Sequence, residues 1–234
     1  MHTPGTAPPP NLLDLGLLVG GAPRVLVCGD ADFAYSCALA AHLRRSTDSA
    51  RIWASCYESE DDLHVRFPDA AAAIAALRRN DVDVACGVDA RELSRHYGED
   101  ARFDRIVFNL PQSPPMPRAR NQIQRHRALL RDFCKSAELH LAPAGQLWIT
   151  LLAGQGGTPV DPIQRPPGDT WQLQHESARA GLLVVAALPV DIDALAQEGY
   201  APTGRRNSKK LGVNRQSRGM LAHVLEREGG APAV

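Results

Sequence analysis

The sequence predicts an α/β fold in which helices cover both faces of a mostly parallel sheet. Two observations predict it. Strand-like and helix-like segments alternate along most of the chain. Strand-like segments such as RIVFN and LLVVAAL are apolar without interruption, which is typical of strands buried on both faces. A chain of 234 residues, 44% of them hydrophobic, is long enough for one domain with a three-layer core.

The expected elements follow from local periodicity. Strands are expected at Arg24–Cys28, Arg51–Cys56, Val82–Cys86, Asp104–Asn109, Gln146–Leu152 and Leu182–Ala187, with Gly219–Leu225 returning antiparallel beside the sixth strand. Helices are expected at Ala34–Arg45, Asp69–Arg79, Arg91–Tyr97, Asn121–Leu141 and Thr170–Ala180. We expect residues 1–23 to be a flexible leader with a short helix at Asn11–Val19, residues 24–225 to be the domain, and residues 226–234 to be a flexible tail.

Composition argues against several classes of protein. No apolar stretch approaches 18 residues and the N-terminus lacks a basic start, so we expect neither a membrane span nor a secretory signal. The five cysteines form no CxxC pair, which favours a reducing, intracellular compartment over a disulfide framework. The eight histidines show no ligand spacing, so we expect no metal. Lys plus Arg equals Asp plus Glu, at 26 each, so the global charge identifies no partner.

The loop after the first strand favours a cationic ligand. It reads Gly29-Asp30-Ala31-Asp32-Phe33, with one glycine for close backbone approach. Its two carboxylates would repel a pyrophosphate but suit an amine or a sulfonium, which points away from NAD and toward S-adenosylmethionine. A plain strand-to-helix turn with an aspartate as helix cap is the alternative.

Three further strand ends carry residues suited to a nucleoside. Glu58 follows the second strand, where its carboxylate is placed to accept hydrogen bonds from the hydroxyls of a ribose. Asp89, followed by Ala90, comes after the third strand and is placed to accept a hydrogen bond from an adenine amino group. Asn109-Leu110-Pro111 forms a turn after the fourth strand. Each has a simpler alternative: an acidic helix start, a helix cap and an ordinary turn. Because all four strand ends meet at one sheet edge, together they predict a nucleoside site.

Several segments resemble, in order, those of the rRNA uridine-N3 methyltransferase-like family, typified by the fungal large-subunit rRNA enzyme. They are CGDADFAYSCALA, SCYESEDDL, GVDA and FDRIVFNLPQ, followed by Arg125, Leu129-Leu130, Ile149-Thr150-Leu151, Trp171, Tyr200 and Arg205-Arg206. The resemblance implies a Rossmann-like methyltransferase with a mostly parallel seven-stranded sheet, S-adenosylmethionine as cofactor and RNA, expected to be rRNA, as substrate. It also implies a cytoplasmic location in a bacterium, or a nuclear or nucleolar one in a eukaryote.

The chain departs from the family pattern at three positions. Ala31 replaces a glycine, Leu110 replaces a phenylalanine that would offer a stacking surface, and Gln112 replaces a histidine and cannot act as a general base. For a uridine N3 target, the Asn109 side-chain oxygen and the Leu110 carbonyl would accept from the imide N–H, with Pro111 fixing the turn. Exocyclic amines would fit equally well, so the turn leaves the target atom open.

Two segments without acidic residues favour RNA as the partner. One follows the Asn109 turn and contains Arg118, Arg120 and Arg125, with Arg127 and Arg131 further on; the other contains Arg205 and Arg206. Solvated surface is the alternative for both. Methylation of a small molecule or a protein, or a cofactor-binding accessory role without catalysis, also remains open, as does the oligomeric state.

Overall fold

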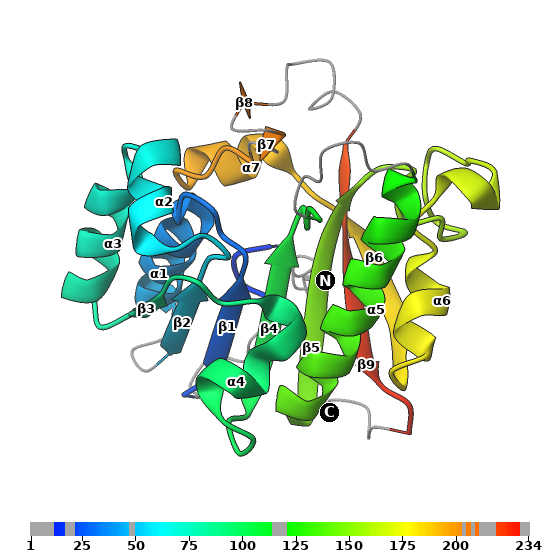
Figure 1. Cartoon of the computed structure of the whole chain (residues 1–234), viewed down its shortest axis with the longest axis horizontal. Coiled ribbons are helices and arrows are strands. Elements are labelled where there is room, and N and C mark those ends of the chain that lie inside the picture. The colour runs from blue at the N-terminus through cyan, green and yellow to red at the C-terminus, as the bar shows by residue number, and fades with distance from the viewer. Residues whose placement is uncertain are drawn as a thin grey trace, which may run out of the picture.

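Figure 1 shows the computed structural model of the chain, in which a seven-stranded sheet lies between two layers of helices. The structure describes residues 12–16, 22–46, 50–113, 121–202, 205–206, 209–210 and 219–229. The predicted fold class is confirmed, including the antiparallel final strand.

The sheet has the strand order β3-β2-β1-β4-β5-β9-β6. Its strands are β1 (Arg24–Cys28), β2 (Arg51–Ser55), β3 (Asp83–Ala85), β4 (Phe103–Asn109), β5 (Leu141–Leu152), β6 (Leu182–Pro189) and β9 (Met220–Arg227). The β1 strand pairs in parallel with both β2 and β4, while β9 lies antiparallel between β5 and β6. The chain runs outward from β1 to β3 and then returns to β4. Ligands of open α/β sheets bind at the carboxyl edge where the order reverses in this way.

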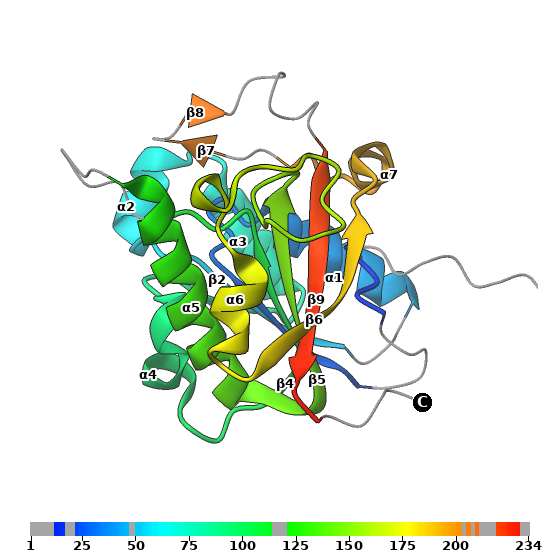
Figure 2. The same ribbon diagram turned by 90° about the vertical axis from the view of Figure 1, so that its right-hand side faces the viewer.

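Both faces of β1 are buried, because its side chains alternate between two cores. Val25 and Val27 belong to one core, and Leu26 and Cys28 to the other. The first core is covered by α1 (Ala34–Ser46), α2 (Glu60–Arg66), α3 (Ala70–Arg79) and α7 (Ile192–Gln197). The second is covered by η1 (Ala90–Glu92), α4 (Leu93–Tyr97), α5 (Gln122–His140) and α6 (Leu173–Ala178). Figure 2 shows α5 and α6 on one side of the sheet and α1 on the other.

Three further short elements lie outside these layers. A turn of 3-10 helix, η2 (Pro167–Asp169), precedes α6, and β7 (Arg205–Arg206) pairs antiparallel with β8 (Lys209–Lys210). Figure 1 draws β7 and β8 beyond the carboxyl edge of the main sheet, near α7.

Two structural expectations were wrong in part. Residues 12–16 form a turn instead of a helix, with positive φ at Leu15 and Gly16, although Leu12, Leu13 and Leu15 do pack into the core. The apolar LLVVAAL segment is not buried on both faces: Leu183 is 44% exposed and Val185 is 53% exposed. The reason is that β6 lies at the edge of the sheet, where no further strand and less helix covers it.

In the part of the chain that the structure describes, no helix is long and apolar enough to cross a membrane. Within the same residues, no three side chains of the metal-binding types gather closely enough to hold an ion.

Candidate active site

Gly29 is required where β1 ends. Its φ is +65°, and a Cβ atom built on it would lie 2.4 Å from the Phe108 ring of the neighbouring strand. A side chain at this position would therefore be strained by the backbone and would also displace a core aromatic residue. The glycine brings the backbone of β1 close to the end of β4, where Asn109 follows Phe108.

The two aspartates of this loop stabilise the start of α1. Asp30 accepts from the Ser36 backbone N–H at 2.7 Å and from the Ser36 hydroxyl at 2.6 Å, and Asp32 accepts from the Ala34 N–H at 3.3 Å. Burial raises the pKa of Asp30 to about 6, although the Ser36 hydrogen bonds oppose the rise. The carboxylates thus have the capping role that was the alternative to ligand binding.

Phe33, the last residue of the loop, has a backbone conformation and a burial that the sequence did not predict. Its φ is +57° and its side chain is fully buried in the α1-side core. Phe33 is thus an anchor that holds the loop to this core.

Glu58 and Asp89 both have basic partners. The Glu58 Oε1 atom lies 2.6 Å from the Arg66 Nη1 atom, and the Glu58 carbonyl accepts from Gly87 at 2.7 Å, which ties the ends of β2 and β3 together. Asp89 caps η1 by accepting from the Arg91 N–H at 3.0 Å and also pairs with the Arg91 guanidinium. The Arg91 hydrogen bonds lower the pKa of Asp89, so this group is a carboxylate at neutral pH. Ala90 beside it is buried.

The Asn109 turn holds polar atoms that make no hydrogen bond of ordinary length within the described structure. Both polar atoms of the Asn109 amide are buried in this way, with the Tyr35 hydroxyl as a looser polar neighbour, and the Thr150 hydroxyl is buried without a partner among the described residues. The register pairs Asn109 with Thr150, so both side chains project from the same face of the sheet at its carboxyl edge. Leu110 has a φ of +48° and donates its N–H to the Thr150 carbonyl at 2.9 Å, and Pro111 is buried. Unsatisfied buried groups are rare in folded proteins and are expected where a ligand completes them.

A second polar group lies on the α5 side of this turn. The exposed Gln112 places its Oε1 atom 3.4 Å from the Nε2 atom of His126, which is buried in α5 and stacks on Trp171 with ring centroids 4.1 Å apart. Sequence analysis did not single out Thr150 or His126 as site residues. Thr150 is revealed by the register of β5 against β4, and His126 by its contact with Gln112 from α5. Both are tertiary features.

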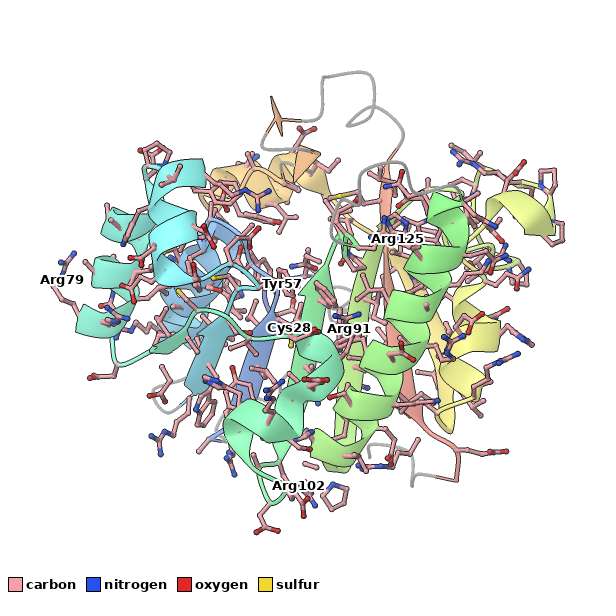
Figure 3. All side chains as sticks on the ribbon, in the orientation of Figure 1. Cys28, Tyr57, Arg79, Arg91, Arg102 and Arg125 are labelled. Atoms are coloured by element: carbon pink, nitrogen blue, oxygen red, sulfur yellow. The ribbon has the colours of Figure 1, made fainter. Side chains whose placement is uncertain are left out.

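The predicted RNA-binding arginines are only partly described. Arg118 and Arg120 lie outside the described residues, as do the side chains of Arg205 and Arg206. Arg125 is half-buried, and Figure 3 shows it at the end of α5 nearest the Asn109 turn. Arg127 is buried and donates to the carbonyls of Pro167 and Thr170, so it holds a loop and does not face solvent.

Residues 26–203 match the model of the family described as BMT5-like, rRNA (uridine-N3-)-methyltransferase BTM5-like. The chain belongs to this family. The match covers most of the domain and confirms the resemblance that the sequence segments predict.

Curated relatives of the chain are longer proteins. The ferredoxin-fold anticodon-binding domain-containing protein 1 of Homo sapiens is 31% identical over 216 residues, which are 90% of this chain and 32% of that protein. Its Mus musculus homolog is 32% identical over 80% of this chain and 29% of that protein. The chain thus spans about a third of the length of these two relatives.

Solved structures with the same fold are more distant in sequence. The glycopeptide N-methyltransferase MtfA superposes with a TM-score of 0.53 at 14% identity, covering 89% of this chain and 84% of that one. TrmN from Thermus thermophilus superposes with a TM-score of 0.51 at 19% identity, covering 88% of this chain and 44% of that one. The fold of this family member is therefore the Rossmann-like methyltransferase fold.

Proposed function

We propose that the chain transfers a methyl group from S-adenosylmethionine to a base nitrogen of RNA, with rRNA as the substrate. The family description supports both the reaction and the class of RNA. A superposed structure of MtfA, with a TM-score of 0.52 at 16% identity over 89% of each chain, is described as a complex with S-adenosylmethionine, which supports the choice of cofactor.

The observation that carries the proposal is the Asn109 amide, which is buried without a hydrogen bond of ordinary length. It lies at the carboxyl edge of β4, next to the reversal of strand order, with the Thr150 hydroxyl beside it. A side chain with one acceptor and two donors suits a ligand rich in N–H groups and carbonyls better than it suits an apolar core.

The residues of the first loop fit a cationic cofactor. Asp30 and Asp32 place negative charge after Gly29, and Glu58 and Asp89 place carboxylates at the ends of the next two strands. When bound, S-adenosylmethionine supplies an electrophilic methyl group on a sulfonium. The protein's tasks are then to hold the cofactor and the base in line and to exclude water.

Mass spectrometry of rRNA nucleosides from cells with and without the gene tests the proposal. We expect one methylated nucleoside to disappear from the rRNA of cells without the gene, and to return when the wild-type gene is restored. Purified protein given unmethylated rRNA and labelled S-adenosylmethionine should restore the same mark. Cofactor binding without any transfer to RNA would contradict the proposal and favour an accessory role.

A further inference from the structure

The pair formed by Gln112 and His126 lies beside the Asn109 turn and joins the end of β4 to α5. Gln112 is exposed, two residues after Leu110, whereas His126 is 4% exposed on α5. One end of the Gln112 amide is therefore near a buried ring and the rest of the side chain is open to a substrate.

The hydrogen bonds of His126 fix its tautomer. Its Nδ1 atom lies 2.8 Å from the Gln122 carbonyl, one turn earlier in α5. A carbonyl oxygen can only accept, so Nδ1 carries the hydrogen, and in the neutral ring Nε2 is an acceptor.

The same geometry fixes which end of the Gln112 amide faces the His126 ring. The atom of Gln112 nearest to the His126 Nε2 atom, at 3.4 Å, is placed as Oε1. Two acceptors cannot share a hydrogen bond, and the oxygen and nitrogen of an amide are assigned from such networks. With Nε2 of the ring as acceptor, the NH₂ end of Gln112 must turn toward His126, and its carbonyl oxygen turns away toward the open side.

The surroundings hold the His126 ring in place. The ring stacks on Trp171 at an interplanar angle of 28°, and the backbone N–H of Trp171 donates to the Gln155 carbonyl at 2.7 Å. Arg127 donates to the Thr170 carbonyl, which precedes Trp171 in the chain. The segment between β5 and α6 thus holds the Trp171 ring on which His126 stacks.

We propose that His126 is a positioning residue, which orients the Gln112 amide so that its carbonyl oxygen accepts a hydrogen bond from the substrate nitrogen that is methylated. The inference rests on the proposed function and deepens it: the site selects a nitrogen that carries hydrogen, such as a base imide or amine. When the methyl group moves, a nitrogen–carbon bond replaces the sulfur–carbon bond, whose electron pair stays on sulfur. The N–H proton leaves to water, because the amide oxygen accepts the hydrogen bond without taking the proton.

A double-mutant cycle separates orientation from simple structural support. An amide has one acceptor end, so its direction matters, whereas a carboxylate presents oxygen at both ends. His126→Phe keeps an aromatic ring against Trp171 but removes both nitrogens. We expect it to slow single-turnover methylation of unmethylated rRNA about tenfold in the wild-type background, and to have little effect in the Gln112→Glu background. A purely structural His126 would cause equal losses in both.

Nuclear magnetic resonance of labelled protein provides a second readout that needs no substrate. We expect the His126 ring to carry hydrogen on Nδ1 alone, and the Gln112 side-chain NH₂ signals to shift in His126→Phe. A ring protonated on Nε2 would overturn the inference, as would equal losses in the cycle while the wild type is active. A wild type that transfers no methyl group to RNA would instead overturn the proposed function, and with it the selection that Gln112 is proposed to make.

Discussion

At the scale of single residues, the carboxyl edge combines satisfied and unsatisfied polar groups. The loop carboxylates Asp30 and Asp89 have partners within the chain, in Ser36 and Arg91. The Thr150 hydroxyl has no such partner among the described residues, and the Asn109 amide has only the looser contact with the Tyr35 hydroxyl. Groups that the fold itself does not satisfy cost stability and are retained where a ligand uses them. This difference, together with the position of both residues at the carboxyl edge of the sheet, marks the Asn109 turn as the centre of the site.

Asn109→Ala tests this interpretation, because it should separate stability from function. The buried amide makes no hydrogen bond of ordinary length and only a looser contact with the Tyr35 hydroxyl, so we expect the free energy of unfolding to stay within about 1 kcal/mol of wild type. We expect affinity for S-adenosylhomocysteine to fall about tenfold, which corresponds to about 1.4 kcal/mol. Urea denaturation and calorimetry measure the two quantities.

Asn80→Ala is the matched control for that change. Asn80 ends α3 and accepts from Arg44, so it lies on a helix end and not at the carboxyl edge of β4. We expect it to leave the affinity unchanged. If Asn109→Ala lowered stability by several kcal/mol and left affinity intact, Asn109 would be a structural turn former.

At the scale of elements, local periodicity predicted the helices and strands whose pattern is set by residues close in the sequence. The buried strands and the long helix α5 were predicted because their apolar spacing is uninterrupted. The short helix α7 was not predicted, and α2 was anticipated only as the acidic helix start that was the alternative for Glu58, since six and seven residues give little periodicity to detect. The exposure of Val185 depends on β6 being an edge strand, which is a property of strand order and not of the segment itself.

The same limit applied to the site: its strand ends were predictable from the sequence, whereas contacts between elements were not. The strand ends bearing Gly29, Glu58, Asp89 and Asn109 were identified, because a parallel sheet brings such ends to one edge. The partners of those side chains were not, since Arg66 and Arg91 contact them through helix geometry. The pairing of Gln112 with His126 joins a loop to a helix fourteen residues later and leaves no mark in the local pattern.

The β9 strand carries a buried histidine whose titration should affect stability. His223 is fully buried and its Nδ1 atom lies 3.2 Å from the Ile149 carbonyl of β5. Burial lowers the pKa of His223 below the ordinary value of 6.5. The unfolded chain therefore binds the proton first as pH falls, so this contribution to stability is complete above about pH 6.5 and is lost below it.

His223→Gln should therefore reduce the pH dependence of stability. We expect the loss of unfolding free energy between pH 7.5 and 5.5 to be smaller in the variant than in wild type, by up to about 1.4 kcal/mol per pH unit. Urea denaturation at the two pH values measures it. His64→Gln on an exposed face of α2 is the control and should retain the wild-type dependence. An unchanged dependence in His223→Gln would assign the acid sensitivity to other groups.

At the scale of the whole molecule, the chain has no net formal charge, so attraction of RNA must come from how its charges are distributed. Arg125 lies near the carboxyl edge, whereas Arg79 and Arg102 lie far from it in Figure 3. Arg127 belongs to the same basic segment of the sequence, but its guanidinium donates to the Thr170 carbonyl inside the protein. The proposed RNA contacts therefore reduce to Arg125, with Arg118 and Arg120 predicted from sequence and Arg205 and Arg206 on the short β7 strand.

Replacing Arg118, Arg120 and Arg125 together by glutamine tests that distribution. Each phosphate contact that is lost should reduce the slope of log affinity against log salt by about 0.7 to 0.9, because fewer counterions are released on binding. We expect the triple variant to bind an rRNA fragment more weakly with a flatter salt response, and to bind S-adenosylhomocysteine as wild type does. Arg79→Gln combined with Arg102→Gln is the control, and it should change neither quantity. If the control variant weakened RNA binding as much as the triple variant, attraction would be spread over the whole surface and the carboxyl edge would have no special part in it.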